Sequence, residues 1–206
     1  GYEEDEDSII PIAGIVRDAI VRRMARTSDA SLVGSTVAAP FTSLTSATAA
    51  GGHADNVVAT SGAAILATKA QLHTLRSNMG QWGMNPSDLV CILSQALYYS
   101  LVADTDVTTV DKYGENATIR SGELGKLWGI SLIVSDAMPA TATAKPQAIM
   151  LNPSNYLIGT HRGLTIEMAT DVVAQQRAMV ATRRFGFIAK EAGAAGKAST
   201  AFAKFG

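Results

Sequence analysis

The 206-residue chain contains a single cysteine, Cys91, so it cannot form an intramolecular disulfide. A lone cysteine in an apolar stretch is most often a small buried side chain, and we expect Cys91 to be one. No apolar run approaches the roughly 18 residues of a membrane-spanning helix. The N-terminal segment is acidic, whereas a signal peptide begins with basic residues. The sequence therefore gives no sign of a disulfide-bonded, secreted or membrane protein.

Charge is also scarce. The 17 basic and 18 acidic residues leave a formal net charge of -1, so no basic excess attracts the chain to nucleic acid or anionic lipid. Charged residues make up 17% of the chain, against about 25% in ordinary soluble domains. Ser, Thr and Gly also solvate a surface, but the low charge favours a surface that is partly covered by partners.

The motifs of common active sites are missing. His53, His73 and His161 fall in three separate regions without a second ligand at metal spacing. The segment 159–163 has the outline of a nucleophile elbow, but His161 stands where the serine would be, so we predict a plain turn. The Gly-Lys pair at 125–126 lacks the other residues of a phosphate-binding loop, and no dinucleotide fingerprint is present. We predict no catalytic, cofactor-binding or metal site.

A long amphipathic helix is predicted over residues 8–27. Five acidic residues at 3–7 precede Ser8, a suitable N-cap, and apolar residues then recur at helical spacing up to Met24. Arg22, Arg23 and Arg26 would interact favourably with the negative, C-terminal end of the helix dipole. These arginines are expected either on a solvated helix face or in salt bridges to a neighbouring chain.

The rest of the chain predicts short mixed elements. A helix is expected over 64–79, a strand at 89–93, a short helix at 94–103 and a strand at 130–134, which glycine and proline bound on either side. Strands are also expected at 156–159, 164–168 and 175–189, the last with arginines among its apolar residues. The phrase Asn-Pro-Ser occurs twice, at 85–87 and 152–154, and predicts two turns.

The order of these parts resembles the major capsid protein of tailed bacteriophages, which has the HK97-type fold. The similarity spans about residues 5–190, and it depends on the order and spacing of several short phrases rather than on any one of them. The phrases are the long helix with the segment 26–34, Met-Asn-Pro-Ser at 84–87, and the segments 122–139, 156–168 and 177–187.

The resemblance implies an α+β fold of two domains. A peripheral domain would combine the spine helix in residues 1–44 with strands and the C-terminal tail in 164–206, the helix lying on a β-sheet. A mixed α/β axial domain would occupy residues 45–163 and would meet its copies at capsomer centres. The implied function is a structural shell subunit, not an enzyme, that self-assembles into hexamers and pentamers around DNA bound without sequence specificity. Candidate interface residues are Arg22, Arg23, Arg26, Arg162, Arg183 and Arg184.

Members of that family carry an N-terminal arm and an extended loop ahead of the spine helix, and here only seven residues precede Ser8. The sequence therefore predicts a chain that lacks these parts and that could remain monomeric. The alternatives are an encapsulin-like nanocompartment shell and, less favoured, a small-molecule enzyme. The expected location is the virion, after assembly in the host cytoplasm.

Overall fold

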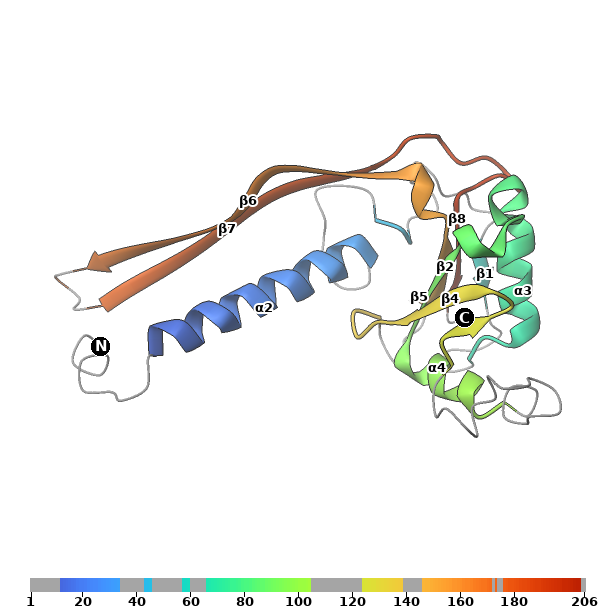
Figure 1. The fold of residues 1–206 in the computed structure, drawn as a ribbon, viewed down its shortest axis with the longest axis horizontal. Coiled ribbons are helices and arrows are strands. Elements are labelled where there is room, and N and C mark those ends of the chain that lie inside the picture. The colour runs from blue at the N-terminus through green and yellow to red at the C-terminus, as the bar shows by residue number, and fades with distance from the viewer. Residues whose placement is uncertain are drawn as a thin grey trace. The chain divides into compact units, whose positions relative to one another are not determined.

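The computed structural model describes residues 12–33, 43–45, 57–59, 66–104, 124–138, 146–171, 173 and 176–204 (Figure 1). The chain divides into two compact units. Unit 1 contains Gly1–Asp29 and Ile158–Phe187, and unit 2 contains Ala30–Leu157 and Ile188–Gly206. None of the helices in these ranges is both long and apolar enough to cross a membrane.

Unit 2 is built on a mixed six-stranded sheet. Its strand order is β1-β8-β5-β2-β4-β3, with β1/β8 and β2/β4 parallel and the other pairs antiparallel. The strands are β1 (Val57–Ala59), β2 (Val90–Leu93), β3 (Lys126–Leu127), β4 (Ile130–Val134), β5 (Pro146–Leu151) and β8 (Thr200–Lys204). The sequence predicted β2 and β4 and missed β5 and β8, the two strands that join the halves of the sheet.

Two of the described helices cover the core of unit 2. Helix α3 (Lys69–Asn78) begins at Thr68, whose side chain forms a reciprocal capping box with Gln71, so the helix starts later than the predicted residue 64. Helix α4 (Gln95–Val102) is capped by Ser94 and confirms the predicted helix there. Their apolar faces pack with the strands into one cluster of fully buried side chains, which includes Leu72, Leu75, Met79, Leu93, Leu97, Ile130 and Met150.

The two Asn-Pro-Ser phrases adopt the same local structure. Each forms a one-turn 3₁₀ helix, η3 (Pro86–Asp88) and η5 (Pro153–Asn155), whose preceding asparagine accepts a hydrogen bond from the serine backbone N–H. Val90, which begins β2, lies opposite Leu151, which ends β5. The two turns therefore lie at the same end of the sheet.

The tight turn between β3 and β4 places a bulky residue in an unusual conformation. Trp128 has a φ of 51° and Gly129 a φ of 81°, a pair of left-handed residues that a two-residue hairpin requires. Glycine accepts this conformation freely, whereas for other residues it costs roughly 1–2 kcal/mol. Asparagine is the usual first residue of such a turn, so the tryptophan is not explained by the turn itself.

A second close approach joins η2 (Gly80–Gly83) to the segment that precedes β8. Gly80 has a φ of +57°, and a Cβ atom built on it would lie 2.0 Å from the carbonyl oxygen of Gly196. Only glycine therefore fits at residue 80 without moving the backbone.

The structure confirms that Cys91 is buried, on β2. Burial raises the pKa of its thiol from 9.0 to about 12. In the unfolded chain the thiol titrates near its ordinary value, so between pH 9 and 12 the folded chain binds one more proton than the unfolded chain. The free energy of unfolding should consequently fall as the pH rises through this window.

We expect this fall to be smaller in Cys91→Ala, because only the thiol contribution is removed. Urea unfolding of both proteins between pH 8 and 11 measures the difference in slope. A thiol reagent at pH 8 should modify the native wild type slowly and the urea-unfolded chain rapidly. Equal labelling rates in the two states would contradict the assignment.

The described part of unit 1 consists of a helix and a two-stranded ribbon. Helix α2 (Ile12–Val33) contributes its residues up to Asp29, and the ribbon pairs β6 (Tyr156–Asp171) with β7 (Gln176–Ala189) (Figure 1). The predicted turn at 159–163 is wrong, because β6 runs through these residues without a break. Glycines at 159 and 163 suggested a turn, but each has open space around its Cβ position within an extended strand.

Helix α2 also continues past the predicted end at residue 27. Because it extends to Val33, Arg22, Arg23 and Arg26 lie in the body of the helix, and its last turn contains no basic residue. The prediction that these arginines lie at the C-terminal end of the helix dipole is therefore wrong. The predicted N-cap, Ser8, and the acidic segment 3–7 lie outside the described residues.

The compact units divide the chain at other places than the predicted capsid domains. The prediction joined 1–44 with 164–206 and set 45–163 apart, whereas the units change at 29/30, 157/158 and 187/188. The largest difference is the C-terminal segment. Because β8 pairs with β1 and β5, Ile188–Gly206 belongs to unit 2.

Candidate assembly surface

Unit 1 has no interior in the part of it that the structure describes. None of the described side chains in residues 12–29 and 158–187 is buried. On α2, the half-buried side chains of Ala13, Ile20, Met24 and Ser28 share one face. A folded segment normally buries apolar side chains to offset the loss of chain entropy, so unit 1 is poorly stabilised by its own contacts.

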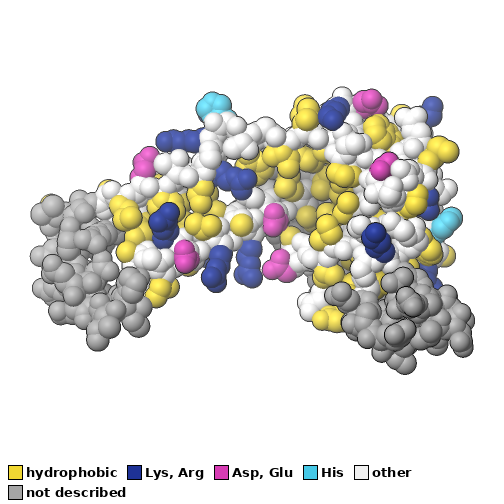
Figure 2. Space-filling view, in the orientation of Figure 1, with side chains coloured by type: hydrophobic (Ala, Val, Ile, Leu, Met, Phe, Trp, Pro, Cys, Tyr) yellow, Lys and Arg dark blue, Asp and Glu magenta, His cyan; other side chains and the backbone are white. Residues whose placement is uncertain are grey.

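Many large apolar side chains of unit 1 face solvent instead. On β6, Ile158 is 61% exposed and Met168 is 62% exposed, and on β7 Val180 is 55% exposed. Helix α2 exposes Ile15 to 57%. Figure 2 shows yellow hydrophobic side chains interspersed with dark blue basic ones over α2 and the ribbon. Such a mixture is typical of a surface that is covered in an assembly.

All six arginines that the sequence singled out lie on unit 1. Each of the six side chains is exposed, three of them on α2 and three on the ribbon. We call this set of six exposed arginines on unit 1 the arginine surface. It brings together, on one compact unit, residues that are up to 162 positions apart in sequence: Arg22, Arg23, Arg26, Arg162, Arg183 and Arg184.

Two of these arginines make contacts within their own unit. Arg183 donates from Nη1 to Ser28 Oγ at 3.4 Å, and its guanidinium lies 4.9 Å from the ring centroid of Phe185. Arg162 Nη2 lies 3.7 Å from Glu167 Oε1, with both side chains more than half exposed. A long, exposed ion pair of this kind adds little to stability, so Arg162 can exchange Glu167 for another carboxylate at small cost.

Among the side chains that the structure describes, no three His, Cys, Asp or Glu are grouped so as to hold a metal ion. His73 on α3 and His161 on β6 are both exposed, and His53 lies outside the described residues. Sequence reasoning did not single out Tyr99 as a surface feature.

The family model described as the phage capsid family matches residues 6–195. The chain belongs to the phage capsid family. This confirms the resemblance recognised in the sequence, and with it a family of structural capsid proteins rather than enzymes.

Individual relatives agree with the family assignment. The major capsid protein of Escherichia phage T5 is 28% identical over 120 residues, which cover 58% of this chain and 26% of that protein. The chain therefore spans about a quarter of the length of this curated relative.

Solved capsid structures share the fold. The capsid of a native GTA particle has a TM-score of 0.74 at 16% identity, covering 98% of this chain and 68% of that one. The capsid of an empty GTA particle has a TM-score of 0.72 at 17% identity, covering 98% of this chain and 69% of that one. A structure from Mycobacterium phage Che8 has a TM-score of 0.64 at 14% identity, covering 97% of this chain and 65% of that one. The predicted α+β, HK97-type capsid fold is confirmed.

Proposed function

We propose that this chain is a structural shell subunit of a tailed-phage or prophage capsid. Copies assemble into hexamers and pentamers that enclose DNA without reading its sequence, and the shell forms in the host cytoplasm and becomes the virion. The observation that carries the proposal is the family match over residues 6–195. In this function, the predicted peripheral domain combines 1–44 with 164–206, and the predicted axial domain is 45–163.

The physical character of unit 1 supports self-assembly. A unit without buried side chains in its described part gains stability when a neighbouring copy covers its apolar residues. Repeated contacts between identical subunits produce closed symmetric shells or rings, so a modest interface suffices when it recurs many times. The arginines would fix the register of these contacts through ion pairs.

Electron microscopy of the intact gene product that contains this chain tests the proposal. We expect closed shells, with DNA inside when the protein is produced in the course of a phage infection. A product that remains monomeric at all concentrations, or that forms shells only around an enzyme cargo, would contradict it.

Charge reversal tests the arginine surface. Changing each of the six arginines to Glu should weaken assembly about tenfold or more per site, which corresponds to about 1.4 kcal/mol, because each places like charges together at a contact. Sedimentation of the intact protein measures the assembled fraction. Arg17→Glu, an exposed position on the same helix outside the set, is the matched control. If the six variants assemble as well as Arg17→Glu, the assignment of these residues is wrong.

A further inference from the structure

The β3–β4 turn of unit 2 presents an aromatic projection to solvent. The Trp128 indole remains 40% exposed, and the edge of the His73 ring meets it at a centroid distance of 5.8 Å and an angle of 85°. The exposed Lys126 precedes the turn on β3. We call Trp128, His73 and Lys126 the knob.

Unit 2 also contains an aromatic hollow. It has a volume of about 520 Å³ and is lined by Gln95, Tyr98, Tyr99, Val134 and Asp136, from α4 and from the end of β4 and the residues after it. Tyr98 is held in place because its Oη accepts a hydrogen bond from the backbone N–H of Leu124 at 3.0 Å. Tyr99 is 61% exposed, and its ring meets that of Tyr98 edge to face at 5.8 Å. We call this hollow the socket.

We propose that the knob of one copy packs into the socket of a second copy of this chain. The two features are complementary in chemistry. An indole packs edge to face on tyrosine rings, and tryptophan and tyrosine are the residues that most often dominate binding at interfaces. The knob includes the basic residues Lys126 and His73, whereas the socket contains the Asp136 carboxylate. The volume of the socket is within the range of about 300–1,000 Å³ that accommodates compact ligands.

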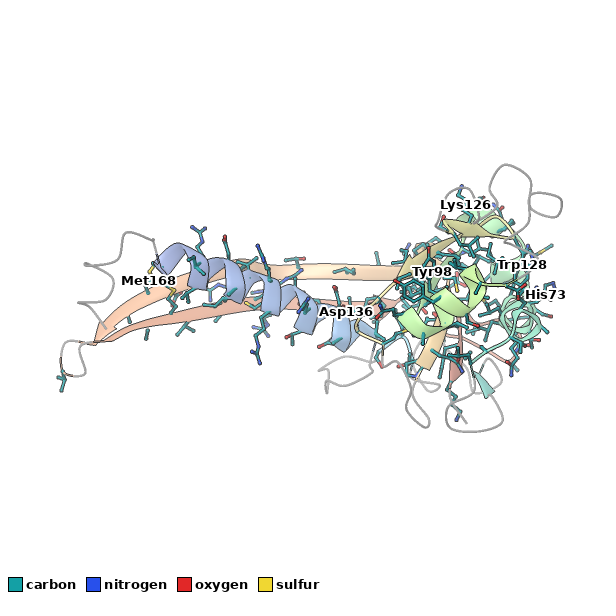
Figure 3. All side chains as sticks on the ribbon, turned by 90° about the horizontal axis from the view of Figure 1, so that it is seen from below. His73, Tyr98, Lys126, Trp128, Asp136 and Met168 are labelled. Carbon is teal, nitrogen blue, oxygen red and sulfur yellow. The ribbon has the colours of Figure 1, made fainter. Side chains whose placement is uncertain are left out.

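The positions of the two features suit a ring of subunits. A head-to-tail contact between identical copies joins two different patches of the surface, and it closes into a ring when the rotation repeats. Figure 3 shows Trp128 and His73 at one side of unit 2 and Tyr98 and Asp136 at another. The GTA capsids that share this fold are described as computed with C5 symmetry, an arrangement that repeats copies around a five-fold axis. The inference rests on the proposed shell function and names the contact that forms its capsomers.

The conformation of the turn supports an intermolecular role for the indole. Trp128 occupies a left-handed position that asparagine would take at lower cost, so the turn gives up stability to present this side chain. The indole also lies beside a small apolar gap of about 10 Å³, lined by Leu72, Cys91, Met150 and other core residues. The competing explanation is that Trp128 only covers this part of the core.

The variant Trp128→Asn separates the two explanations. If the indole serves a contact between copies, the isolated subunit should unfold at the same or a higher temperature, since asparagine relieves the backbone, while half-assembly requires at least a tenfold higher concentration. If the indole serves only the core, the unfolding temperature falls and assembly is retained, which would overturn the proposal. Tyr99→Ala tests the other partner of the contact, because Tyr99 is exposed and belongs to the socket and not to the knob. Unchanged assembly of Tyr99→Ala would overturn the proposal whatever the stability of the first variant.

A crosslink would show the contact directly. Lys126→Cys and Gln95→Cys, combined in one chain, should form disulfide-linked ladders of copies in assembled shells and not in dilute subunits. Lys126→Cys with Ala192→Cys, an exposed position outside the socket, is the control and should give no ladder. The buried Cys91 should not compete for oxidation.

The outcomes also distinguish this contact from the shell function. Wild-type protein that forms no shells would overturn the proposed function and this inference with it. Normal shells from Trp128→Asn and Tyr99→Ala, without a specific crosslink, would overturn only the inference.

Discussion

Gly80→Ala should destabilise the chain by about 2 to 5 kcal/mol. Two costs add, since a non-glycine residue at a φ of +57° is strained by roughly 1–2 kcal/mol and overpacking costs typically 1–3 kcal/mol. The added methyl group would meet the carbonyl oxygen of Gly196, a backbone atom that cannot move without shifting the segment before β8. Urea unfolding followed by circular dichroism measures the loss.

The matched control is Gly125→Ala. Gly125 is exposed, and no atom lies within 4 Å of the position that its Cβ would take. We expect a change within about 0.5 kcal/mol for this variant. Equal stabilities for Gly80→Ala and Gly125→Ala would show that the segment around Gly196 does not lie against η2 as described.

Asn155→Ala should cost about 2 to 4 kcal/mol. Asn155 is only 2% exposed and its side chain makes three hydrogen bonds. Its Oδ1 accepts from the Glu191 backbone N–H at 2.9 Å, and its Nδ2 donates to the Glu191 carbonyl oxygen at 3.1 Å and to Ser199 Oγ at 2.8 Å. Removing the amide leaves buried polar groups with fewer partners, and each such loss costs roughly 1–3 kcal/mol. The unfolding temperature should fall by about 5–10 °C.

The other Asn-Pro-Ser turn, η3, supplies the control for this variant. Asp88 occupies the equivalent place in η3, but it is exposed and bonds only to neighbours within its own turn, through Asn85 and Ser87. Asp88→Ala should therefore change stability by less than 1 kcal/mol. A similar loss in the two variants would mean that the amide of Asn155 does not join the start of β6 to the segment after β7.

Local sequence signals located the elements whose boundaries depend on neighbouring residues. Ser94 marks a helix start because its side chain caps the backbone, and glycine next to a β-branched run limits β4. The arginines of β7 were correctly placed in a long strand. The family resemblance then supplied the overall fold, which composition and spacing alone did not contain.

Other features depend on contacts that are distant in sequence. Strand β8 consists of small residues such as Ala201 and Ala203, which have little strand propensity, and it is specified by pairing with β5 some fifty residues earlier. The glycines of β6 suggested a turn, but pairing with β7 keeps the strand extended. The knob and the socket come from different segments, so no local pattern could join them.

The lack of buried side chains in the described part of unit 1 has a consequence for how its sequence can vary. Substitutions there should leave the melting curve of a lone subunit nearly unchanged, and their effect should become visible only when many copies meet. Natural selection on this part of the protein would then act mainly on the fit between molecules and hardly on the folding of any single one.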